Sequence, residues 1–182
     1  MVIEPSAAHH FIAGYQCLLA LVDAQSTQPS GLTGMNLLVH SRRIIADDPA
    51  RLDAALNALA EKGEALADDV RAAVQSLQLK QWVYLRDTTQ YSVFIDPALE
   101  KAYAVLGLTQ PLKQVIGGSG ASIHTGVMAY RGQYVCDGLF SGQLVWLGAG
   151  YKTSFSENLA DIKKRQNFYK TPTALSSPSR QT

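Results

Sequence analysis

The sequence predicts an α+β fold in which N-terminal helices pack on a C-terminal antiparallel β-meander, closed by a C-terminal helix. Apolar residues recur at helical spacing over most of residues 1–79, and short aromatic and β-branched runs replace that pattern over residues 80–150. Helices followed by consecutive strands are typical of α+β proteins and not of alternating βαβ units. We therefore expect an antiparallel sheet with helices over one face.

Length and composition predict one domain over residues 1–171. The chain has 182 residues, of which 47% are hydrophobic and 17% charged, and this is enough for one well-buried core. Its last stretch, TPTALSSPSRQT, is polar and rich in Pro and Ser. Such a composition has little to bury, so we expect residues 172–182 to form a disordered polar tail.

Start and stop signals define the expected N-terminal helices. Residues 6–22 carry one apolar stripe, with Ser6 as the expected N-cap, and residues 32–45 predict a short helix. A further helix begins at Asp48-Pro49, where Asp48 can cap and Pro49 suits the first helical position. Gly63 interrupts its pattern, which predicts either two helices or one kinked helix.

The C-terminal half contains short runs that we expect to be strands, separated by turn-forming residues. Two of them flank Arg131-Gly132, which fits a two-residue hairpin connection. A helix over 156–169 follows, with Leu159, Ile162 and either Phe168 or Tyr169 directed inward. The expected strands cover residues 81–85, 91–95, 101–108, 122–130, 133–136 and 144–147.

Composition also bears on location and partners. The chain has no apolar run long enough to span a membrane, and its first residues lack the basic start of a secretory signal. We therefore expect a cytoplasmic protein that does not interact with membranes. Cys17 and Cys136 are too few for a disulfide framework, so both are expected to be free thiols.

The segment 115–150 is rich in glycine and contains the first candidate site. Gly117, Gly118, Ser119 and Gly120 form a loop whose backbone N–H groups could approach a phosphate or another ligand. Phosphate-binding loops normally lead into a helix, whereas this loop leads into an expected strand. The alternative interpretation is a connector that lets the chain reverse into the next strand.

A second candidate site combines Cys136 with His124 and Asp137, as nucleophile and assisting groups of a hydrolase or transferase. A hairpin centred on Arg131-Gly132 pairs residue 136 with 127 and residue 124 with 139. Cys136 and His124 then lie on opposite faces unless a bulge at Gly126 changes the register. Asp137-Gly138 is also a strong turn signal, and a buried, unreactive cysteine is the structural alternative.

A third candidate is the basic end of the C-terminal helix, where Lys163, Lys164, Arg165 and Lys170 could contact nucleic-acid phosphates. A solvated basic face explains the same cluster, and nucleic acid is the less favoured partner. The aromatic residues of the β-half, among them Trp82 and Tyr84, are expected to fill the core.

These observations favour a non-catalytic protein-binding module that binds a protein partner or forms a homo-oligomer. No nucleophile, base and orienting group converge by spacing, and no pair of His or Cys has metal-ligand spacing. We expect no cofactor and no metal. The cysteine-dependent enzyme and the nucleic-acid-binding helix remain as alternatives.

Overall fold

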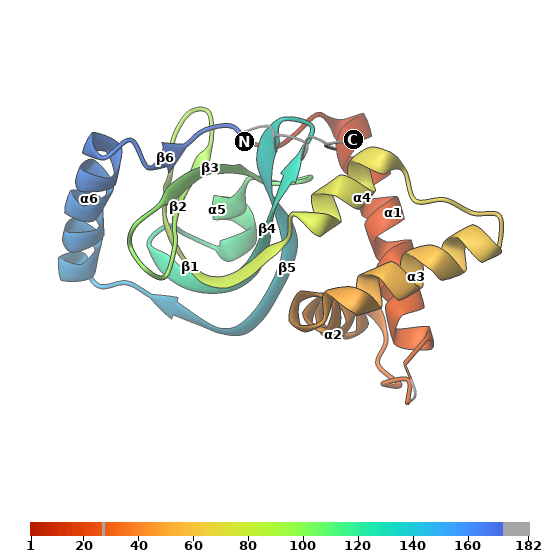
Figure 1. The fold of residues 1–182 in the computed structure, drawn as a ribbon. Coiled ribbons are helices and arrows are strands. Elements are labelled where there is room, and N and C mark those ends of the chain that lie inside the picture. Colours follow the sequence, from red (N-terminus) through yellow and green to blue (C-terminus); the bar gives the residue numbers. More distant parts are fainter. Residues whose placement is uncertain (27, 173–182) are drawn as a thin grey trace, which may run out of the picture.

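The computed structural model describes residues 1–26 and 28–172, so all but the first residue of the expected tail lies outside the described part. Helices fill the N-terminal part, as the apolar periodicity predicts (Figure 1). They are α1 (Pro5–Ala24), α2 (Gly34–Asp47), α3 (Pro49–Glu61) and α4 (Asp68–Gln75).

Local sequence signals explain where these helices begin and end. Asp48 caps α3 by accepting the N–H of Ala50, and the chain leaves the helix before Gly63, which gives two helices and not one kinked helix. The N-cap of α1 is Glu4 and not Ser6, because the Glu4 carboxylate accepts the N–H groups of Ser6 and Ala7.

The remaining described residues form strands and two more helices. The hairpin of the first two strands, the third strand and the turn at Arg131-Gly132 occur where the sequence predicts them. The elements are β1 (Gln78–Asp87), β2 (Ser92–Ile95), β3 (Ala102–Leu106), α5 (Leu112–Ile116), β4 (Ala121–Tyr130), β5 (Gln133–Trp146), α6 (Ala149–Lys164) and β6 (Phe168–Tyr169).

The C-terminal end differs from the expected pattern in two places. The expected separate strand over 144–147 is the distal part of β5, which continues through its irregularities to Trp146. Phe168 and Tyr169 do not belong to the last helix, because they pair in parallel with Ala102 and Tyr103 of β3 as strand β6.

The sheet is mixed and closes on itself, so the prediction of a purely antiparallel meander is wrong. The strand order is β2-β1-β4-β5-β3-β6, and β2 also pairs with β3, which closes β1 to β5 into a barrel. β3 and β5 are parallel, because α5 and β4 intervene between them in the chain. The five strands β1 to β5 thus form a closed mixed barrel, with α5 between β3 and β4 in the chain.

Apolar side chains fill the barrel and cover two of its outer sides. Trp82, Tyr84 and Cys136 lie in the interior with α5, as Figure 1 shows for the helix. On one outer side, α1 to α4 cover residues of β4 and β5 such as Met128. On another, Leu159 of α6 packs on β1, β2 and β3. Helices therefore cover the barrel on more than the single face predicted, and the aromatic strand residues Trp82 and Tyr84 are core.

Candidate functional site

Asp137 lies inside β5, at a local irregularity of its pairing with β4. Val127 pairs with Cys136, as the hairpin register predicts, but Thr125 pairs with Phe140. Three residues of β5, 137 to 139, thus lie opposite Gly126 alone, and Gly138 takes a φ of 74°. Asp137-Gly138 is therefore neither a turn nor an exposed carboxylate, because the left-handed glycine serves a bulge that turns the Asp137 side chain into the protein.

The Asp137 carboxylate is fully buried and accepts several hydrogen bonds. Arg42 of α2 donates through Nη1 at 3.0 and 3.2 Å, and its side chain is only 1% exposed. Gly126 and Leu139 donate their backbone N–H groups, and Thr125 donates its hydroxyl at 3.1 Å. Burial raises the pKa of Asp137, while Arg42 and these donors oppose that shift by favouring the charged form.

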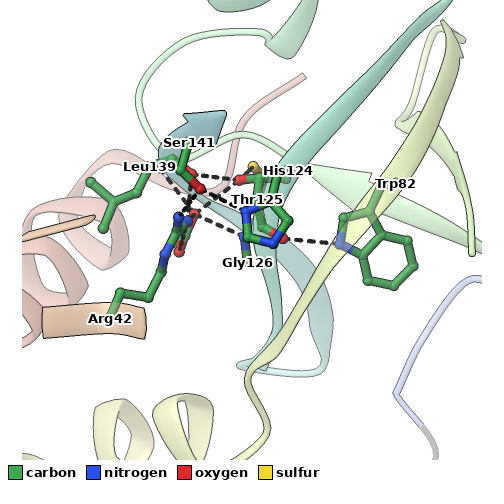
Figure 2. A network of polar contacts seen from close by, with 9 residues as sticks. Arg42, Trp82, His124, Thr125, Gly126, Leu139 and Ser141 are labelled. Atoms are coloured by element: carbon green, nitrogen blue, oxygen red, sulfur yellow. Dashed lines mark hydrogen bonds and ion pairs between the residues drawn. The ribbon is translucent and has the colours of Figure 1, made fainter. Parts of the chain in front are cut away.

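Arg42 also connects Asp137 to two polar side chains, Ser141 on β5 and His124 on β4. Figure 2 shows Arg42, Ser141 and His124. Arg42 Nη2 donates to Ser141 Oγ at 3.1 Å, and Ser141 Oγ lies 2.6 Å from His124 Nδ1. Because a guanidinium can only donate, Ser141 accepts from Arg42, and the same hydroxyl shares a hydrogen bond with His124 Nδ1. Ser141 thus engages His124 Nδ1, whereas Nε2 has no hydrogen-bond partner among the described residues.

The surroundings of His124 favour the neutral form of its ring. Burial lowers the pKa of His124, and the positive charges of Arg42 and Arg43 lower it further. The imidazole is therefore neutral at pH 7. The sequence predicts residue 139 as the partner of His124, but the structure pairs His124 with Ser141, because the irregularity at Gly126 shifts the register.

His124 and Ser141 border a cleft of about 950 Å³ between α2 and the strands β1, β4 and β5. Two cations, Arg43 and Lys80, line it, together with His40. Lys80 Nζ has no carboxylate within ion-pair distance among the described residues, and it lies 5.4 Å from the centre of the Trp82 ring.

One carboxylate, Asp47, also lines the cleft. It forms an ion pair with Arg43 at 3.4 Å, but both side chains are largely exposed. Exposed pairs of this kind contribute little and exchange readily with water. Arg43 is thus available to a ligand, and positive charge exceeds negative charge in the cleft.

Cys136 lies apart from this cleft, in the barrel interior, and His124 is not its hydrogen-bond partner. Its Sγ is 3.4 Å from Thr125 Oγ1, and burial raises the pKa of the thiol to about 12. Cys136 and Asp137 border a second cavity of about 260 Å³ with mostly apolar walls. The arrangement gives the thiol no base, so its role as a nucleophile stays a prediction without geometric support.

The glycine-rich loop after α5 packs against the distal part of β5. A Cβ at Gly118 would lie 2.9 Å from the Trp146 ring, and the Gly120 carbonyl accepts the N–H of Leu147 at 2.9 Å. Gly117 ends α5 with a φ of 88°. These contacts give Gly117, Gly118 and Gly120 structural tasks, and ligand binding by them and Ser119 stays a prediction.

The basic residues at the end of α6 are exposed, as a solvated face requires. Lys164 pairs with Asp161 at 3.1 Å, and Lys163 Nζ lies 5.2 Å from the centre of the Phe168 ring. The opposite side of α6 faces the barrel strands β2 and β3, with Leu159 and Ile162 buried against them. Nucleic-acid binding by the basic cluster remains a prediction.

Three residues of the network, Arg42, Thr125 and Ser141, are not among the residues that the sequence singles out. Arg42 carries a signal that could have revealed it, because it follows Leu38 by four residues and precedes Ile45 by three. It therefore lies on the apolar stripe of α2. A charged residue on a buried stripe requires a buried partner. Thr125 and Ser141 carry no such signal.

No protein-family model matches the chain, and neither the curated proteins nor the solved structures include one significantly similar to it. The function has to be inferred from the site itself. In the described part of the chain, no helix is both long and apolar enough to cross a membrane. Within the same residues, no three His, Cys, Asp or Glu side chains converge as a metal site requires.

Proposed function

We propose that the protein is a non-catalytic binding module that holds a small anionic molecule in the cleft between α2 and the barrel. The observation that carries this proposal is the position of His124 in the cleft lining, where Ser141 engages Nδ1 and Nε2 has no hydrogen-bond partner among the described residues. Lys80 and Arg43 border the same cleft and supply positive charge. A carboxylate, phosphate or sulfate group accepts hydrogen bonds from such donors.

Isothermal titration calorimetry with sulfate, pyrophosphate and citrate tests this proposal. Lys80→Gln and Arg43→Gln each remove one charged donor, and such hydrogen bonds contribute about 1.5–3 kcal/mol. We therefore expect each variant to bind about tenfold or more weakly. Lys62→Gln is the matched control, because Lys62 is exposed at the end of α3, away from the cleft lining. Absence of binding to all three anions, or an equal loss in the control, contradicts the proposal.

The pH dependence of sulfate binding tests the part assigned to His124. Its pKa lies below the ordinary 6.5, so the ring gains a proton, and the cleft a charge, only as pH falls below that value. Sulfate itself does not titrate in this range. We expect affinity to increase between pH 7 and pH 5 in the wild type and to increase less in His124→Gln. Identical pH profiles would exclude His124 from the site.

A second candidate function is the protein-binding module that the sequence favours. The observation that supports it is a group of exposed apolar side chains at the distal end of β5 and the start of α6: Leu144, Val145, Trp146 and Tyr151. Exposed apolar patches mark interaction surfaces in many proteins. Size-exclusion chromatography with light scattering tests this candidate, because a bound partner or a second copy raises the mass of the eluting species.

A further inference from the structure

The distal part of β5 exposes large apolar side chains on both of its faces. The exposed fractions are 42% for Leu144, 53% for Val145 and 49% for Trp146, and Tyr151 at the start of α6 is 67% exposed. Consecutive residues of a strand point to opposite faces. Both faces of this segment are therefore only partly covered by the rest of the described chain.

One edge of the same segment is open. β5 pairs with β4 up to Trp146, whereas β3 pairs only with Tyr134 and Val135. No strand among the described residues pairs with the other edge at residues 142–146. The Leu147 N–H donates to Gly120 of the β4 side and Val145 pairs with Ser122, so by strand alternation the backbone groups of Trp146 point to the open edge.

The open edge lacks the charged residues and prolines that usually prevent pairing, although an irregularity at residues 142–144, opposite Ile123, precedes Val145. Natural edge strands often carry charged residues, especially Lys, or proline, and these prevent association. Between Asp137 and Lys152 the sequence contains no charged residue and no proline. An uncharged strand can pair with an identical strand without like-charge repulsion.

Trp146 is held in place before any association. The ring lies so close to Gly118 that an added Cβ would be 2.9 Å from it. This contact orders the ring on the glycine-rich loop while half of its surface stays exposed. A pre-ordered aromatic side chain loses little conformational entropy on binding, which favours it as an anchor.

We propose that the open edge of β5 pairs with the same edge of a second copy of the chain, antiparallel and across a two-fold axis at Val145. Val145 then faces Val145 of the second copy, and each Leu144 faces the other copy's Trp146. In this register Leu144 and Trp146 are the hydrogen-bonded pairs, because the backbone groups of Trp146 point outward. Every central pair is apolar, and aromatic–aliphatic cross-strand pairs are favourable. This inference rests on the second candidate function and is independent of the anion-binding cleft.

Sedimentation velocity over about 1–100 µM protein, the range in which a modest interface associates, tests the dimer. Val145→Lys places two ammonium groups opposite each other at the axis, so we expect the dimer dissociation constant to rise at least tenfold. Met35→Lys is the matched control, because Met35 is 59% exposed on α2 and lies outside the edge. A wild type that stays monomeric at all concentrations, or a dimer that survives Val145→Lys, overturns the proposal.

Disulfide trapping tests the register. In a Cys17→Ser background, which removes the exposed native thiol, Val145→Cys brings two thiols together at the axis. We expect a covalent dimer on mild oxidation. Gln143→Cys is the control, because it would face residue 147 of the second copy and its two thiols would be about 13 Å apart along the strands. Equal cross-linking of both variants overturns the register.

Binding of an apolar fluorescent dye separates this inference from the candidate function on which it rests. A monomeric wild type that binds the dye, with binding lost in Trp146→Lys, overturns the dimer but leaves an accessible apolar surface for a different partner. A monomeric wild type that does not bind the dye overturns both. Sulfate binding should be unchanged in Val145→Lys, since the cleft lining does not include Val145.

Discussion

At the scale of single residues, burial separates the two cysteines. Cys17 is exposed on α1, whereas Cys136 is buried in the barrel and its thiol has a pKa raised to about 12. Because this pKa lies well above 8, the Cys136 thiol stays protonated at pH 8, and iodoacetamide reacts with the thiolate. We expect one adduct per wild-type chain by intact-mass spectrometry and none for native Cys17→Ser. Denaturant should expose Cys136, and an adduct on it in the folded protein would revive the cysteine-enzyme alternative.

At the scale of elements, the β4–β5 hairpin shows what a sequence can predict. The turn at Arg131-Gly132 and the pairing of Val127 with Cys136 follow from local turn signals and strand period, and both are confirmed. Beyond Gly126 the predicted register is wrong, because a bulge there turns Asp137 toward Arg42 on a distant helix. A contact between residues so far apart in the chain does not change the hydrophobic period of β4 or β5, so the period could not predict it.

In the other elements, too, local signals were predictable and contacts between distant segments were not. The N-terminal helices were predictable from apolar spacing and from Asp48-Pro49. Closure of the barrel through parallel β3 and β5 was not, because those strands are brought together by the chain that intervenes between them. Phe168 and Tyr169 continue a helical pattern in the sequence, yet they form β6 because β3 offers its free edge to them.

The bulge itself gives a prediction at this scale, because Gly126 leaves room for the Asp137 carboxylate. A Cβ at this position would lie 2.4 Å from Asp137 Oδ2 and 2.7 Å from Leu77 Cδ1. We expect Gly126→Ala to lower the free energy of unfolding by about 1–3 kcal/mol, the usual cost of overpacking. Gly148→Ala is the control, since a Cβ there meets no atom within 4 Å. Equal urea midpoints for the two variants would show that the bulge can relax.

At the scale of the whole molecule, the buried pair of Arg42 and Asp137 joins the helical layer to the barrel. Arg42 belongs to α2, and Asp137 belongs to β5. Removing one partner of a buried ion pair leaves the other charge uncompensated, which typically costs about 3–5 kcal/mol. We therefore expect Arg42→Met and Asp137→Asn each to destabilise the protein strongly. In the double variant no buried charge is left, and the amide oxygen that Asp137→Asn introduces can still accept the N–H groups of Gly126 and Leu139.

The double variant should thus be more stable than the sum of the two single losses implies, with a coupling of the size seen for residues in direct contact. Urea unfolding of the single and double variants measures this coupling. Two signals are followed in a Trp146→Phe background: circular dichroism reports on the helical layer, and fluorescence of the buried Trp82 reports on the barrel. In the parent the two transitions should coincide, because the pair makes the layers unfold together. In Arg42→Met the helical signal should be lost at lower urea than the Trp82 signal, because α2 has lost its charged anchor to β5. Strictly additive losses, or coincident transitions in every variant, would mean that apolar packing alone couples the layers.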